Sequence, residues 1–495
     1  MAEREEWGSR IGFVLAAMGS AIGLGNIWRF SYMCYANGGG AFLVPYFFAL
    51  LTAGIPIMVL EIGVGSMTRF SAPFALGKVA GKKAEWIGWW TAIAALILNS
   101  YYMTILAWAF LYIFKSFTLA WGEDPGGYFF GNVLGLTDAP FILGGIRLPV
   151  LLSFIVIVLI NWFIVSRGVK GGIERACKIF LPLMWAIVLL LVIRGITLPH
   201  GLEGINWYLK PDFSQLANHK VWLDAYGQIF FTLSLGMGTI IVYGSYLRKG
   251  ADVVNNSFLV SLGNCGFSFL AGFAVFGTLG YVAYVLNKPF GEVVEAGIGL
   301  AFVMYPKAIS LLPAGKALVG VLFFFLLTIA GLSSSMSLME NTVGILMDGY
   351  KLNRMKATSI VAGASFLIGL IYTTGAGLYW LDIVDHFISY YALALVGLLE
   401  TIVVTWVFGA EKFREFVNSV SEIKAGSWWT VCAKYVTVAI LAILLLLDIY
   451  SLATEGYGGY PGKALGVGFG YILLGMIVAY LLQSKEKLDI TKEVS

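Results

Sequence analysis

Charged residues are scarce in this chain. Asp, Glu, Lys and Arg together make up 12% of its 495 residues, about half of the roughly 25% that is usual in a soluble domain. Apolar residues account for 59% and aromatic residues for 15%. This composition excludes an ordinary soluble protein and predicts an integral membrane protein.

Cysteine and histidine are also rare, with four and three copies. Cys34, Cys177, Cys265 and Cys432 lie in or beside apolar runs without paired spacing, so neither a disulfide framework nor a cysteine metal site is indicated. The net charge of +4 comes from cations in short loops, and this distribution does not indicate a nucleic-acid partner. The apolar runs contain no nucleophile and base at a catalytic spacing, so we do not expect an enzyme.

Long apolar runs are the dominant feature of the sequence. A run of about 18 or more apolar residues can cross a bilayer as a helix. We therefore predict an all-α integral membrane protein with twelve transmembrane helices, near 10–36, 40–68, 86–116, 149–167, 174–196, 221–247, 253–285, 315–348, 357–373, 378–407, 428–452 and 463–483.

The placement of Lys and Arg predicts the orientation of the chain. An even number of spans leaves both ends on one side, and the loops on that side hold most of the cations. The positive-inside rule then places both termini, 1–9 and 484–495, in the cytoplasm of a multi-pass cell-membrane protein. The connections 117–148, 197–220 and 286–314 would lie outside, and we expect the last to dip into a vestibule.

Two of the apolar runs are interrupted. Three glycines and Asn26 occur within residues 19–26, and a second cluster, Ser234-Leu235-Gly236-Met237-Gly238, lies in the run 221–247. A helix in hydrocarbon must satisfy its own backbone, so such breaks are tolerable where they line a cavity. Interrupted spans in corresponding halves are typical of the midplane site of a secondary transporter. Close helix packing is the alternative use of the glycines, but Asn26 favours the cavity.

Several motifs in order resemble the neurotransmitter:sodium symporters. They are Trp7, Arg29-Phe30, Asn37-Gly38-Gly39-Gly40-Ala41-Phe42, Pro45-Tyr46, Gly54-Ile55-Pro56, Glu61, Gln228-Ile229-Phe230-Phe231-Thr232-Leu233-Ser234-Leu235-Gly236 and Ala330-Gly331-Leu332-Ser333-Ser334-Ser335. The rule about interrupted helices rests in part on this same family, so the breaks and the resemblance are not independent.

The resemblance implies a LeuT-type fold. Two inverted five-helix repeats, 10–196 and 221–407, would each begin with an unwound helix, the first and the sixth, and helices eleven and twelve would occupy 408–483. It also implies sodium-coupled symport of an amino acid by alternating access. A sensor that keeps the fold without coupled flux is the alternative. The expected partners are a small amino-acid substrate and membrane lipid, with the protein a monomer or a homodimer.

Two sodium sites follow from the resemblance. Sodium is a hard cation that prefers five or six oxygen ligands. The first ion would be held by the Ala21 carbonyl, Asn26, Thr232, Asn264 and the substrate carboxylate. The second would be held by the carbonyls of Gly19, Ile22 and Ala330 and the hydroxyls of Ser333 and Ser334. Membrane serines more often bond back to their own helix, and this alternative remains open for Ser333 and Ser334.

The residue at position 23 indicates whether the substrate carries its own carboxylate. Family members that carry amines without a carboxylate have Asp at this position, so glycine implies that the substrate brings its own carboxylate, to which Tyr102 would donate. The residues implied to bind the substrate are Ser20, Ala21, Leu24, Gly25, Leu98, Tyr102, Phe231, Thr232, Ser234, Met237, Ser334 and Leu338. This apolar lining has no countercharge and favours a neutral hydrophobic amino acid. Without the resemblance, its apolar members would be interpreted as ordinary core.

Ser268 departs from many bacterial members of the family, which carry an acid there. It is neutral, as in the animal members that require chloride, and the resemblance implies that Tyr46, Gln228, Thr232 and Ser268 would bind chloride. Two buried cations with one zwitterion leave excess positive charge, which is costly at low dielectric. We therefore hypothesise chloride binding; another acid or an empty site is the alternative.

Charges that are expensive in a membrane suggest gates. Arg29 and Asp385 match the external ion pair of the family, and Arg4 and Asp348 match the internal pair. Each could instead be a snorkelling interfacial residue.

Three further features accompany these pairs. Trp7 and Tyr246 are expected beside the internal pair. The buried acids Glu61 and Glu400 are expected to support the first span rather than to carry protons. Gly172 and Pro182 match a family feature that marks local weakness in span five.

Overall fold

The computed structural model describes residues 4–294 and 297–483. These residues form helices and no strand, with two isolated bridges, Gly39 to Pro211 and Ile146 to Thr374. The prediction of an all-helical protein is confirmed. The predicted tail 484–495 and the first three residues of the segment 1–9 lie outside the described residues.

The helices follow the apolar runs closely. The first part of the chain forms α1 (Arg10–Ala21), η1 (Leu24–Asn26), α2 (Trp28–Ala36), η2 (Gly40–Phe42), α3 (Leu43–Ala49), η3 (Leu50–Gly54), α4 (Ile55–Thr68), α5 (Ala72–Ala80), η4 (Lys82–Ala84), α6 (Glu85–Thr118), α7 (Pro125–Gly127), η5 (Tyr128–Leu134), α8 (Leu148–Ser166), η6 (Val169–Glu174), α9 (Arg175–Thr197) and α10 (Gly201–Leu209).

The rest of the chain is built in the same way. It forms η7 (Phe213–Ala217), α11 (His219–Thr232), α12 (Thr239–Ser245), α13 (Val254–Leu286), η8 (Phe290–Glu292), α14 (Gly297–Gly299), η9 (Leu300–Met304), α15 (Tyr305–Leu311), α16 (Lys316–Tyr350), α17 (Arg354–Gly369), η10 (Leu370–Thr373), α18 (Gly377–His386), η11 (Phe387–Ala392), α19 (Leu393–Ile402), η12 (Val403–Gly409), α20 (Ala410–Val420), α21 (Ser427–Val431), η13 (Cys432–Thr437), α22 (Val438–Glu455) and α23 (Gly462–Leu481).

Ten helical stretches of the described chain are long and apolar enough to cross a membrane, and the bent pair α1 and α2 makes an eleventh. The remaining predicted span, 221–247, consists of α11 with 14 residues and α12 with 7. Each is shorter than the roughly 18 residues that a span needs. Twelve crossings and two five-helix repeats therefore remain a prediction.

The predicted boundaries agree with the helices to within a few residues, with one large exception. The run 378–407 was expected to end near residue 407, but the helical stretch continues from Gly377 to Val420. Its last part, α20, is strongly amphipathic and buries Phe413 and Val417. Apolar run length underestimates such a helix because its polar face interrupts the run.

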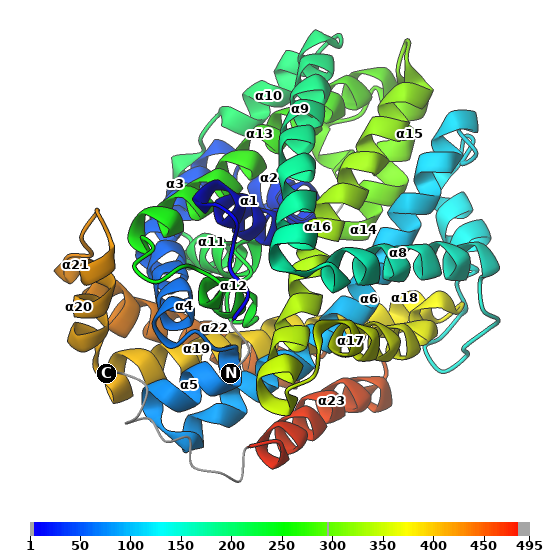
Figure 1. Cartoon of the computed structure of the whole chain (residues 1–495). Helices are drawn as coiled ribbons and strands as arrows, with labels where there is room; N and C mark the ends of the chain where they lie inside the picture. The colour runs from blue at the N-terminus through cyan, green and yellow to red at the C-terminus, as the bar shows by residue number, and fades with distance from the viewer. Residues whose placement is uncertain (1–3, 295–296, 484–495) are drawn as a thin grey trace.

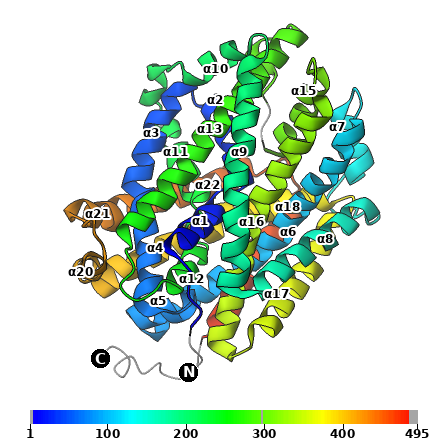
Figure 2. The same cartoon turned by 45° about the horizontal axis from the view of Figure 1, so that its top comes forward.

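The helix α1 lies near the middle of the molecule in both views (Figures 1 and 2) and packs against α9, α13 and α16. The pair α20 and α21 lies at one edge, and α8 and α17 lie at the opposite edge. In the most apolar part of the stretch that contains α22, only 11% of the residues are buried within the protein. Such a large exposed apolar surface is suited to lipid.

Candidate functional site

The first interruption is sharp. The helix α1 ends at Ala21, Gly23 is extended, and η1 and α2 continue in a direction bent by 72° from α1. The carbonyls at the end of a helix have no partner within it. Here the carbonyls of Gly19 and Ile22 lie 3.4 and 3.3 Å from the Ser334 hydroxyl of α16.

The second interruption separates α11 from α12. Ser234, Gly236 and Gly238 have positive φ values of 54°, 72° and 69°, which end one helix before the next begins. The freed Gly236 amide donates to the Glu61 carboxylate at 2.8 Å. Glu61 therefore supports the second break, whereas the sequence interpretation assigned it, with the adjacent buried Glu400, to the first span.

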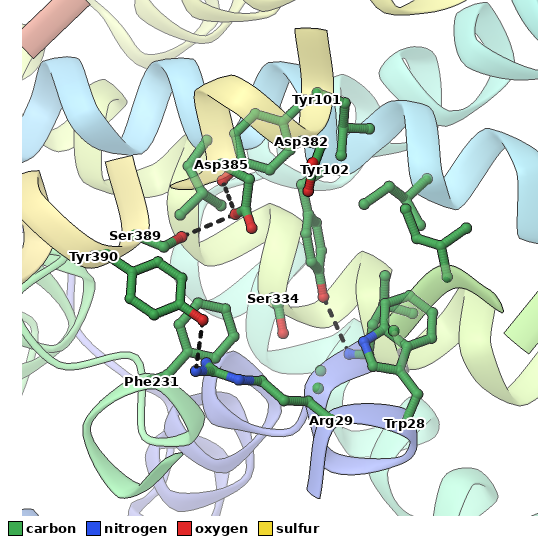
Figure 3. Close-up of a pocket in the computed structure, with 18 of the residues that line it drawn as sticks. Trp28, Arg29, Tyr101, Tyr102, Phe231, Ser334, Asp382, Asp385, Ser389 and Tyr390 are labelled. Carbon is green, nitrogen blue, oxygen red and sulfur yellow. Dashed lines mark hydrogen bonds between the residues drawn. The ribbon is translucent and has the colours of Figure 1, made fainter. Parts of the chain in front are cut away.

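A cavity of about 600 Å³ opens beside both interruptions. Its walls come from α1, α2, α6, α11, α16 and α18, and Figure 3 shows side chains that line it. All the predicted substrate residues except Ser20 line it: Ala21, Leu24, Gly25, Leu98, Tyr102, Phe231, Thr232, Ser234, Met237, Ser334 and Leu338. The Ser20 hydroxyl instead donates to Ser337 at 2.6 Å, while its carbonyl accepts from Ser234.

The side chains of the first predicted sodium site lie together. The Asn26 amide nitrogen donates at 2.8 Å to the Asn264 side-chain oxygen and at 2.8 Å to the Ser268 hydroxyl. Asn264 donates in turn to Thr232 at 3.3 Å, and the Gly23 amide donates to the Asn26 oxygen at 2.8 Å. These neutral amide and hydroxyl oxygens suit a hard cation such as sodium rather than a transition metal.

The residues of the second predicted sodium site also meet. The Ser334 hydroxyl faces the carbonyls of Gly19 and Ile22 across the gap between α16 and α1. The Ser333 hydroxyl instead donates to the Ala330 carbonyl of its own helix at 2.7 Å. A Cβ added at Gly19 would lie 3.3 Å from the Ser333 Cβ, so glycine allows the two helices to approach closely.

The residues predicted to bind chloride lie close to the first cation site. Ser268 accepts the hydrogen bond from Asn26. The Tyr46 hydroxyl and both polar atoms of the Gln228 amide are buried without a hydrogen-bond partner among the described residues. Unpartnered buried polar groups are costly, so this set of donors is suited to a bound ion or water.

The predicted external pair is not joined in this structure. Arg29 lies 4.5 Å above the Phe231 ring and donates to the Tyr390 hydroxyl at 3.5 Å. Asp385 accepts from Tyr101 at 2.6 Å and from Ser389 at 2.9 Å. Figure 3 shows the arginine and the carboxylate pointing to separate partners across the cavity.

The predicted internal pair is joined. Arg4 binds Asp348 at 2.6 Å, and its guanidinium also donates to the Ser245 hydroxyl. The Trp7 amide donates to the Tyr246 carbonyl at 3.1 Å, and its indole donates to the Tyr243 carbonyl at 2.9 Å. The cavity therefore extends to the Arg29 end, where the predicted pair is apart, and Arg4 and Trp7 are not among the described residues that line it.

The chain is similar to known proteins along most of its length. A model of the sodium:neurotransmitter symporter family matches residues 4–127 and 123–488. The chain belongs to the sodium:neurotransmitter symporter family. An uncharacterised sodium-dependent transporter of Methanocaldococcus jannaschii is 49% identical over 481 residues, covering 97% of this chain and 98% of that protein. The human sodium- and chloride-dependent GABA transporter 2 is 34% identical over 509 residues, covering 94% and 84%.

Members of this symporter family are sodium-coupled transporters and not enzymes. The family and the apolar helices together identify a multi-pass membrane protein that handles a small molecule. The described residues contain no cluster of three or more His, Cys, Asp or Glu side chains that could hold a metal ion.

One charge cluster of this symporter was missed in the sequence. Arg354 at the start of α17 binds both oxygens of the buried Glu340 at 2.7 and 2.9 Å and reaches Glu5 at 2.6 Å. The Tyr246 hydroxyl donates to the same Glu340 at 2.6 Å. The acid Glu340 within the apolar run 315–348, with an arginine 14 residues later, was the signal that could have predicted this cluster.

Proposed function

We propose that this protein is a symporter that couples sodium and chloride to the uptake of a neutral hydrophobic amino acid by alternating access. One observation carries the proposal: freed carbonyls and a network of neutral amide and hydroxyl groups surround the same cavity as Tyr102 and a set of apolar side chains. An ion held by Asn26 and Thr232 would lie next to the substrate carboxylate. Direct contact between the two would couple their movements.

The close packing around Gly23 leaves no room for an acidic side chain of the protein and supports a substrate with its own carboxylate. A Cβ added at Gly23 would lie 2.8 Å from the Tyr102 hydroxyl and 2.9 Å from the Ser334 hydroxyl. The Leu24 amide donates to Tyr102 at 3.3 Å, which leaves the Tyr102 hydrogen available to a carboxylate. The freed carbonyls near Ala21 and Phe231 would accept from the amino group.

The opposite part of the cavity supports an apolar side chain. Leu98, Phe231, Met237 and Leu338 face it, and none of them offers a charge. A charged substrate side chain would be desolvated there without a partner, which costs far more than it gains. Methionine adapts its shape readily, so Met237 is suited to side chains of more than one size.

Two sodium ions and one chloride ion are the proposed co-substrates. The first sodium would be bound by Ala21, Asn26, Thr232 and Asn264, and the second by Gly19, Ile22, Ala330, Ser333 and Ser334. Chloride would be bound by Tyr46, Gln228, Thr232 and Ser268. The unpartnered donors of Tyr46 and Gln228 support this assignment, and the chloride dependence stated in the name of the human relative agrees with it.

The proposed arrangement in the cell membrane has twelve crossings, inverted five-helix repeats and both termini in the cytoplasm, in a monomer or a homodimer. With this orientation the Arg29 end of the cavity faces outward. The open external pair and the joined internal pair correspond to an outward-open state. Pairing of Arg29 with Asp385 would close the outer side, and release of Arg4 from Asp348 would open the inner side.

Uptake into liposomes tests the function. The purified protein is reconstituted, and a panel of the twenty amino acids and GABA is assayed with an inward sodium gradient, with choline in place of sodium, and with gluconate in place of chloride. We expect accumulation of a neutral hydrophobic amino acid against its gradient that requires both ions. Binding without uptake would favour the sensor, and full uptake in gluconate would contradict the chloride proposal.

A further inference from the structure

Two tyrosines of the loop 456–461, between α22 and α23, hold the carboxylate of Asp382. The Tyr457 hydroxyl donates to one oxygen at 3.0 Å, and the Tyr460 hydroxyl donates to the other at 2.9 Å. Asp382 lies one helical turn before Asp385 on α18, and both acids line the large cavity. The loop therefore binds Asp382, the second acid that lines the cavity, and not Asp385, the acid of the predicted external pair.

The loop is fixed by more than these two bonds. The Tyr457 ring stacks on His386 with centroids 3.6 Å apart and an angle of 9° between the planes. Gly458 has a φ of 58°, and a Cβ there would lie 2.6 Å from the Tyr460 ring. Glycine thus permits the turn that brings both hydroxyls to one carboxylate. Burial and the charge of Asp382 raise the pKa of Tyr457 and of Tyr460, so both hydroxyls keep their protons.

The two acids use their oxygens differently. Both hydrogen bonds to Asp385 from the described residues, from Tyr101 and Ser389, reach the same oxygen, Oδ1. The other oxygen of Asp385 remains for an arginine. On Asp382 each oxygen already accepts a hydroxyl. Each oxygen of Asp382 can accept a second hydrogen bond, as Oδ1 of Asp385 does, but an arginine that turned to Asp382 would share both oxygens with the tyrosine hydroxyls. Hydrogen bonds to an ionised acceptor are among the stronger ones, so the arginine would meet a carboxylate whose charge is already partly stabilised.

Arg29 is the cation for which these acids would compete. It lies in the same cavity on the Phe231 ring, and its one hydrogen bond within the described residues is the long one to Tyr390. Two carboxylates one turn apart present similar attraction to a guanidinium, and pairing with the wrong one would leave the vestibule partly closed.

We propose that Tyr457 and Tyr460 are positioning residues that keep Asp382 from pairing with Arg29, so that Asp385 is the acid that closes the outer side. This inference rests on the proposed external pair. The loop acts through Asp382 and does not touch the substrate. Loss of the two hydroxyls should trap Arg29 on Asp382, and removal of the Asp382 charge should release it again.

Labelling of a cysteine in the vestibule tests the inference without requiring transport. Leu378 lines the cavity, and the four native cysteines are buried, so Leu378→Cys provides a reporter with a low background. In sodium without amino acid, we expect Tyr457→Phe/Tyr460→Phe to slow its labelling about tenfold, since a bridging arginine lowers the open population. Adding Asp382→Asn should restore the rate to within about twofold of the parent.

The matched control removes two hydroxyls elsewhere. Tyr450 and Tyr480 are 67% and 66% exposed on α22 and α23, and Tyr450→Phe/Tyr480→Phe should leave the labelling rate unchanged. A tyrosine-pair variant that labels like this control would overturn the inference. So would a slowed rate that Asp382→Asn does not reverse, because a purely structural role of the loop predicts no rescue.

Folding and function are checked separately. Size-exclusion and melting profiles identify a misfolded double variant, and the single variants Tyr457→Phe and Tyr460→Phe, which each remove one bond, then give the same comparison with a smaller effect. Wild-type uptake tests the proposed function independently. If uptake fails while the labelling pattern holds, the function is wrong and the positioning role stands; the opposite pattern rejects the positioning role alone.

Discussion

The seal at the Arg4 end gives the sharpest quantitative prediction. Arg4→Met removes a guanidinium that joins the first segment, residues 4–9, to α16 and α12. The lost contacts are the 2.6 Å ion pair with Asp348, hydrogen bonds of 3.2 and 2.6 Å to the Ser245 hydroxyl, and the contact with the Tyr246 ring at 4.9 Å. Asp348 keeps its other partner, the Ser71 amide.

The size of the effect follows from the burial of the pair. The side chains of Arg4 and Asp348 are 15% and 12% exposed. Breaking a fully buried pair costs roughly 3–5 kcal/mol, and an exposed pair contributes about 0–1 kcal/mol. This mostly buried pair lies between those limits, and we take about 2–3 kcal/mol. Since 1.4 kcal/mol is tenfold in an equilibrium constant, the population open at this end should rise roughly 30- to 140-fold.

Native Cys177 provides the assay. It is fully buried on α9, and a Cβ added at Gly19 would lie 3.4 Å from its sulfur, so it borders the second predicted sodium site. Opening of the seal should expose it to a thiol reagent. Peptide-resolved mass spectrometry measures its labelling rate in the absence of sodium, and this rate tracks the open population when reclosing is fast.

The control for this assay is Arg175→Met, which removes an exposed arginine at the start of α9, close to Cys177 in the chain. We expect Arg4→Met to label Cys177 faster than the control by the factor given above. Equal rates in the two variants would show that the Arg4 contacts do not hold this end closed. The reasoning from burial to conformational population would then be refuted.

Three further variants test the site. In a thermal-shift assay, Gly23→Asp should abolish the stabilisation of the protein by amino acids and keep the stabilisation by sodium, because the new side chain would press against the Tyr102 and Ser334 hydroxyls. An undiminished amino-acid shift contradicts the carboxylate assignment. Ser268→Glu should make liposome uptake independent of chloride, since the fixed carboxylate charge replaces the bound anion. Continued chloride dependence would speak against chloride as the group that balances the charge of the sodium ions. Pro182→Ala restores a backbone donor inside α9. It should slow sodium release at the inner side by about threefold to tenfold in a stopped-flow assay. An unchanged rate would show that the proline does not weaken this helix.

Some of the site was predictable because it depends on local chemistry. Glycines together with Asn26 in an apolar run favour a break, so the interruption near Gly23 could be predicted without a fold. Glycines alone do not decide it, since α23 contains five and is continuous. The family motifs then placed Asn26, Thr232, Asn264 and Ser334, and the structure brings these residues to the same two clusters. Ser20 is the one predicted substrate residue that does not line the cavity, and its hydroxyl donates instead to Ser337 of α16.

The pairing of Arg4 with Asp348 came from the family resemblance, and other pairings between distant segments were not predicted. Glu61 was expected to support the first span but binds the Gly236 amide at the second break, because the partner of a buried acid is decided by packing and not by spacing. The same holds for Arg354, whose partners are Glu340, 14 residues before it, and Glu5, near the start of the chain.

Composition and run length alone were enough to give the membrane class, the helical content and the approximate position of nearly every span, since a bilayer imposes the same length and polarity on every crossing helix. The partners of Arg29 and Asp385 were decided by the tertiary arrangement. Arg29 lies on the Phe231 ring, and Asp385 accepts from Tyr101. These contacts depend on how α2, α6, α11 and α18 are placed in space, which is a matter of packing and not of local spacing.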